Sequence, residues 1–117
     1  MARDLILTWP KSAPLRVYLT ELQNARERGD VINYRVAHPP QGIGECQRVY
    51  MVYDGKIRGY SPFIEVVQRG WGEVRDRGGG YWPGGWYIVR SPEWVDLDPS
   101  EQTTMRGFQG YRYIERT

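Results

Sequence analysis

The segment GGGYWPGGWY, residues 78–87, places four large aromatic rings among five glycines. Glycine weakens regular strands and helices, whereas tryptophan and tyrosine bury large areas where they are well packed. Either these rings close the core from outside, or they stack on a flat ligand. The proline and the glycines argue against a close-packed strand at Tyr81 and Trp82, so for YWPGGW we favour the ligand.

Aromatic and cationic residues also meet where other expected strands begin or end. Trp9-Pro10-Lys11-Ser12 follows the first strand, Tyr34-Arg35 ends the second, and RGFQGYRY leads into the last. Proteins recognise a nucleotide base by stacking it on rings and by hydrogen bonds from arginine, glutamine, serine or backbone groups. The pattern therefore indicates a base-binding site, although a single tryptophan is more often a core residue.

Other chemistries find little support in the sequence. His38 is the single histidine, and no further ligands are spaced around it for a metal site. Cys46 is the single cysteine, so it forms no internal disulfide, and we expect a small buried apolar residue there. The glycine-rich segment has no lysine and precedes a strand, unlike a phosphate-binding loop. We expect neither a metal nor a cofactor.

Composition predicts one globular domain, residues 1–117. The hydrophobic fraction is 40%, and the formal net charge of +2 is too small to indicate a nucleic-acid partner by itself. Fourteen of the 16 basic residues are arginine, which stacks on rings and forks onto phosphate, but an arginine-rich codon usage explains this equally well. No apolar run is long enough to cross a bilayer and no secretory signal is visible, so we expect a cytoplasmic protein with no membrane contact.

The first half of the chain reads as strand, helix, strand and hairpin. Apolar patterns predict a strand over residues 4–9, a helix from Pro14 to residue 28 with Ser12 as a possible cap, and a strand over residues 31–36. RVYMVYDGKIRGY is typical of a hairpin with a two-residue turn at residues 54–55. This register pairs Val52 with Ile57 and sets Tyr50 opposite Gly59.

The second half adds further short strands. Residues 63–68, WYIVRS, EWVDLDP and the closing GYRYIE all have extended character. So many short strands would leave exposed edges in an open sheet. The predicted fold class is therefore α+β: a small mixed, mostly antiparallel β-barrel with an N-terminal helix.

Four of these features occur in an order that resembles the PUA-like superfamily, particularly its ASCH and EVE branches. They are an opening strand with a tryptophan before a helix (LILTWPKSAPLRVYLTEL), a Gly-Asp turn into a strand with an aromatic residue (GDVINYRV), the hairpin segment DGKIRGYSPFIEVV, and the late strand WYIVRSPEWVDLDP. In the families, the hairpin segment has the form Ile-x-Gly-x-x-x-Ile/Val. Together these features span nearly the whole chain.

The resemblance implies a small pseudo-barrel with a cleft on one side. Its members include RNA-binding modules, readers of modified bases in DNA or RNA, and some ASCH hydrolases that act on nucleosides or RNA. The ASCH branch carries Gly-x-Lys-x-x-Glu-x-Arg after the first helix. This chain has LQNARERGD there, without the lysine, so the lysine-dependent chemistry does not carry over.

The leading hypothesis is a nucleic-acid-binding module that accommodates a flipped or modified base of RNA or DNA. The candidate residues for one wall of the cleft are Trp9, Lys11 and Ser12, and those for its floor are Tyr34 and Arg35. Trp82 and Trp86 are the candidates for a stacking lid. The candidates for contacts to phosphates or base edges are Arg106, Gln109 and Arg112.

Two alternatives belong to other classes, and the sequence leaves the oligomeric state open. A small hydrolase or ribonuclease of ASCH type would need Lys11 and a carboxylate (Glu45, Glu65 or Asp30) to converge in a dry cleft, with Tyr34 assisting. A protein-interaction module would instead present YWPGGW as a convex patch to a partner chain.

Overall fold

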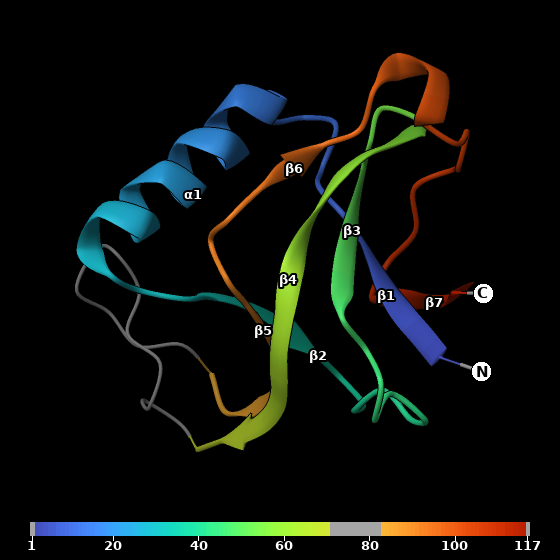
Figure 1. The fold of residues 1–117 in the computed structure, drawn as a ribbon. Helices are drawn as coiled ribbons and strands as arrows, with labels where there is room; N and C mark the ends of the chain where they lie inside the picture. Colours follow the sequence, from blue (N-terminus) through green and yellow to red (C-terminus); the bar gives the residue numbers. More distant parts are fainter. Residues whose placement is uncertain (1, 71–82, 117) are drawn as a thin grey trace.

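The described residues form one curled β-sheet with an α-helix against one face (Figure 1). The computed structural model describes residues 2–70 and 83–116, and Tyr81 and Trp82 lie outside them. The elements, in chain order, are β1 (Ala2–Thr8), α1 (Leu15–Arg28), β2 (Ile32–Val36), β3 (Arg48–Tyr53), β4 (Lys56–Arg69), β5 (Gly85–Arg90), β6 (Val95–Asp96), the 3₁₀ turn η1 (Pro99–Glu101) and β7 (Tyr111–Arg116).

The sheet runs in the order β2-β5-β4-β3-β1-β7, with β6 paired to β4. All described pairings are antiparallel except β1 with β3. β4 is 14 residues long and joins two halves, because residues up to Pro62 pair with β3 while Phe63 and those beyond pair with β5. The α+β class and the mixed, mostly antiparallel sheet are confirmed.

The sheet is not closed into a barrel, so that part of the prediction is wrong. The edge strands β2 and β7 do not pair with each other. A side-chain contact connects them instead: the hydroxyl of Tyr34 in β2 donates to the carbonyl oxygen of Gly110, just before β7, at 3.4 Å. The edge strands β2 and β7 are only five and six residues long, and edge strands this short are tolerated in a sheet that is not closed into a barrel.

Helix α1 packs its apolar stripe onto the sheet. Tyr18, Leu22 and Ala25 are buried at helical spacing, and the first two join a core cluster with residues of β1, β2, β3 and β5. Gly29 ends the helix in a left-handed conformation at φ 67° and donates to the carbonyl oxygens of Ala25 and Arg26. The N-cap residue is Pro14 and no side-chain hydrogen bond caps the helix, so the proposed role of Ser12 as a cap is wrong.

The β3–β4 hairpin forms at Asp54-Gly55 as predicted, but its register shifts by one residue. Val52 pairs with Ile57, yet Met51, and not Tyr50, lies opposite Gly59. A bulge at Arg58 causes the shift, since β4 uses one more residue than β3 there. Gly59 is buried against the segment that contains β6, where an added Cβ would lie 2.5 Å from Cζ2 of Trp94.

Candidate functional site

A cavity of about 330 Å³ opens between α1, β2 and the end of β1. Its size falls within the range of small-molecule sites in proteins, and most of its lining is apolar. The lining residues are Thr8, Trp9, Pro10, Tyr18, Glu21, Ile32, Asn33, Tyr34, Arg35, Met51 and Arg90. We call this hollow the aromatic cavity.

Trp9 and Tyr18 form the aromatic wall. Their ring centroids lie 5.0 Å apart with the planes inclined at 44°. The indole Nε1 of Trp9 donates to the carbonyl oxygen of Ala13 at 3.1 Å, which fixes the ring at the turn between β1 and α1. Trp9 is half-buried, so part of the ring remains available to a ligand.

Tyr34 contributes to the lining of the cavity from strand β2. Burial raises the pKa of its hydroxyl above the ordinary value, while the positive charge of Arg90 lowers it to a smaller extent. The neutral hydroxyl donates to Gly110, so deprotonation would remove a donor that connects the two sheet edges.

A Tyr34→Phe variant is expected to lose less stability in alkali than the wild type. A tyrosine with a raised pKa in the folded state contributes its full stability below about pH 10 and loses it as the pH rises through the folded pKa. Urea unfolding of both proteins at neutral pH and above about pH 10 measures the difference. An equal stability gap at both pH values would contradict this assignment.

Arg90 is a buried charged residue that also lines the aromatic cavity. Its side chain is only 2% exposed, and Nη2 donates to the hydroxyl of Tyr18 at 3.2 Å. Nη1 is buried and has no hydrogen-bond partner among the described residues. Within the same part of the chain no carboxylate forms an ion pair with Arg90. A buried cation with an unused donor is energetically costly.

Arg35 lines the cavity, but its guanidinium lies elsewhere. Successive residues of a strand present their side chains to opposite faces, so Arg35 and Tyr34 point apart. Nε and Nη2 of Arg35 donate to the carbonyl oxygen of Gly84 at 3.2 and 3.1 Å. Arg35, predicted as a floor residue, therefore borders the cavity from β2, while its charged group lies at Gly84.

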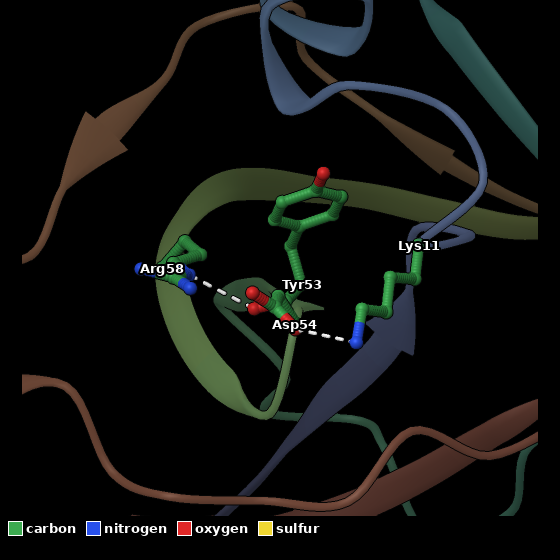
Figure 2. A network of polar contacts seen from close by, with 4 residues as sticks. All are labelled: Lys11, Tyr53, Asp54 and Arg58. Carbon is green, nitrogen blue, oxygen red and sulfur yellow. Dashed lines mark hydrogen bonds and ion pairs between the residues drawn. The ribbon is translucent and has the colours of Figure 1, made fainter.

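A second, more open hollow adjoins the aromatic cavity and shares Thr8 and Trp9 with it. Lys11, Asp54, Gly55 and Arg106 line this hollow, which we call the basic hollow. Nζ of Lys11 lies 3.3 Å from Oδ1 of Asp54, and both side chains are solvent-exposed (80% and 52%). Figure 2 shows this pair beside the hairpin turn, where the bulge residue Arg58 donates to the Tyr53 carbonyl.

Four further candidates among the described residues, Ser12, Trp86, Gln109 and Arg112, line neither hollow. Ser12 and Gln109 are exposed, and Trp86 packs against the core cluster beneath α1. Arg112 lies over the ring of Phe108, 4.7 Å from its centroid, on the sheet face opposite α1 with Ile6. Trp82 lies outside the described residues.

Sequence reasoning missed five polar or aromatic residues of the cavity: Thr8, Tyr18, Glu21, Asn33 and Arg90. Arg90 had a readable signal, because it alternates with Trp86 and Ile88 in WYIVRS and therefore occupies an inward position of β5. Tyr18 and Glu21 are three residues apart on α1 and lie on the same side of the helix, but nothing in the sequence shows that this side borders a cavity.

The described residues contain no group of three histidine, cysteine or acidic side chains that could hold a metal ion. His38 is exposed, and half-buried Cys46 donates through Sγ to the carbonyl oxygen of Arg48 at 3.6 Å. In the described part of the chain, no helix has the length and apolarity that crossing a membrane requires.

Comparison of the chain with protein-family models, with curated protein sequences and with solved structures gives no match.

Proposed function

We propose that the protein is a PUA-like nucleic-acid-binding module that holds a flipped or modified base in the aromatic cavity. The observation that carries the proposal is the convergence of Trp9, which directly follows β1, and Tyr34 of β2 on one cavity that Arg90 also lines. Extruding a base costs a few kcal/mol, and stacking together with hydrogen bonds to the base edge offsets this.

The basic hollow supports the proposal by providing cations next to the cavity. It shares Trp9 with the aromatic cavity, so a nucleotide whose base is in the cavity extends its phosphate toward Lys11 and Arg106. Phosphate contacts position a nucleic acid without reading its sequence. The Lys11–Asp54 pair is exposed and therefore weak, so a phosphate competes with Asp54 for the lysine at low cost.

Titration with single-stranded RNA and DNA oligonucleotides at low salt tests the proposal. We expect binding by the wild type, and a loss of affinity of about five- to tenfold in Lys11→Ala and in Arg106→Ala, with a shallower salt dependence in each. Arg28→Ala is the matched control, because Arg28 is an exposed cation at the far end of α1 that pairs with Asp30. Absence of binding to both nucleic acids would overturn the proposal.

The hydrolase alternative receives no specific support from the geometry. It requires Lys11 and a carboxylate in a dry cleft, where burial shifts pKa values toward catalytic use. Lys11 does meet a carboxylate, but the partner is Asp54 of the hairpin turn and both groups face solvent.

A further inference from the structure

The sheet face opposite α1 carries two arginines that lie over aromatic rings. Cζ of Arg48 in β3 lies 4.3 Å from the centroid of the Tyr60 ring, and its Nη1 donates to the hydroxyl of Tyr50 at 3.3 Å. Cζ of Arg112 in β7 lies 4.7 Å from the centroid of the Phe108 ring. A guanidinium over a ring still has donors along its edge, so both arginines are oriented for an acceptor before any ligand binds.

Strand pairing places these side chains on one surface. A row of paired residues crosses β7, β1, β3 and β4, and its members are Arg112, Ile6, Tyr50 and Tyr60. Arg48 lies two residues before Tyr50 in β3, so the two side chains share a face of the sheet. Arg112 is exposed, and Arg48 and both tyrosines are half-buried. The name arginine face is used below for Arg48, Tyr50, Tyr60, Phe108 and Arg112.

Acidic side chains do not neutralise the arginine face. Among the described residues, neither Arg48 nor Arg112 forms an ion pair. Asp4 lies on the same side of β1, but its carboxylate is only 1% exposed. Oδ1 of Asp4 accepts from the backbone N–H groups of Gln47 and Arg48 at 2.9 and 3.2 Å. The surface therefore fits a polyanion, and its rings fit one that also has flat groups.

The arginine face is continuous with the basic hollow. The backbone N–H of Phe108 donates to Oγ1 of Thr8 at 3.3 Å, and Thr8 lines that hollow together with Arg106. Thr8 pairs with Val52, which lies four residues beyond Arg48 in β3, so strand geometry separates Thr8 from Arg48 by about 14 Å. Contact with both the hollow and Arg48 therefore takes a ligand longer than one nucleotide.

We infer that the arginine face is a second contact surface for single-stranded nucleic acid, which extends from the basic hollow across β7, β1 and β3. This inference rests on the proposed function and adds the flanking nucleotides to it. The guanidinium groups donate to phosphates, and bases stack on the guanidinium planes and on the rings. A duplex keeps its bases stacked on one another, so it gains the phosphate contacts alone.

Fluorescence anisotropy with a labelled ten-nucleotide RNA, and with DNA of the same sequence, tests the inference. We expect Arg48→Gln and Arg112→Gln each to weaken binding about three- to tenfold and to lower the salt slope by about one. A mononucleotide, measured by calorimetry, should bind the wild type and Arg48→Gln equally, because it does not reach Arg48.

Two further variants separate this contact from net charge and from folding. Arg16→Gln is the matched control, because Arg16 is an exposed arginine of α1, on the other side of the sheet, and its loss should leave affinity unchanged. Arg48→Lys keeps the charge but not the planar group, so we expect it to keep the salt slope and still bind more weakly. If Arg48→Gln does not fold, Arg112→Gln and Arg48→Lys still decide the matter.

The outcomes distinguish this inference from the proposed function. Unchanged binding of the ten-nucleotide strands by Arg48→Gln and Arg112→Gln, with weaker binding by Lys11→Ala, would overturn the inference alone. An equal loss of affinity in Arg16→Gln would also overturn it, since net charge would then explain the effect. No binding of either nucleic acid by the wild type would overturn both, and binding of polyglutamate in that case would assign the arginine face to an acidic protein partner.

Discussion

A Gly59→Val variant is expected to lose about 3 kcal/mol of unfolding free energy, the upper end of the usual cost of overpacking a core. Gly59 is buried in β4, and a Cβ there would approach the ring of Trp94 to 2.5 Å and the carbonyl oxygen of Val95 more closely still. That carbonyl belongs to backbone in β6, which pairs with β4, so neither neighbour moves without breaking the pairing. Valine has a higher strand propensity than glycine, so the expected loss of unfolding free energy comes from the steric clash and not from backbone preference.

Chemical denaturation of Gly59→Val and Gly44→Val measures this prediction. Gly44 is the matched control, because no heavy atom lies within 4 Å of a Cβ built there and its φ lies outside the left-handed region. We expect Gly44→Val to change stability by less than about 0.5 kcal/mol. Equal stability of the two variants would show that the β4–β6 segment packs differently.

A Trp9→Leu variant is expected to lose about 1–3 kcal/mol of binding to a base-containing oligonucleotide, a five- to 150-fold weaker Kd, through the loss of one stacking ring. Leucine keeps apolar contact with the core but has no flat face for a base. The substitution also removes the indole hydrogen bond to Ala13, so some stability is lost with it.

Trp94→Leu separates binding from stability. Trp94 contacts the same Tyr18 ring as Trp9, at a centroid distance of 5.6 Å, and is likewise half-buried. It lines a different groove, between α1 and the segment before β6. We therefore expect Trp94→Leu to lower the melting temperature but to keep the oligonucleotide affinity. If both variants lose stability and neither loses affinity, the Trp9 ring is a core residue and not a stacking face.

The elements that carry the aromatic residues of the candidate site were predictable, but the meeting of those residues was not. Trp9 directly follows β1 and Tyr34 lies in β2, yet three strands separate β1 from β2 in the sheet, so only the tertiary structure brings both residues to one cavity. Arg90 ends β5, far from β2 in the sequence, and only the β2–β5 pairing places it beside the cavity. Arg35 was predicted from its neighbour, but strand alternation directs its guanidinium to the other face.

The sequence by itself determined the elements with local causes. Helix α1 follows from its apolar stripe and from Gly29, and the hairpin turn follows from Asp54-Gly55, because helical periodicity and positive φ angles depend on neighbouring residues. Tertiary structure alone decided the strand order, the open edges between β2 and β7, and the bulge at Arg58 that sets Gly59 opposite Met51. It also decided that Arg90 is buried in a cavity without a carboxylate partner among the described residues. These features depend on contacts between residues distant in the chain, whose energies local patterns do not encode.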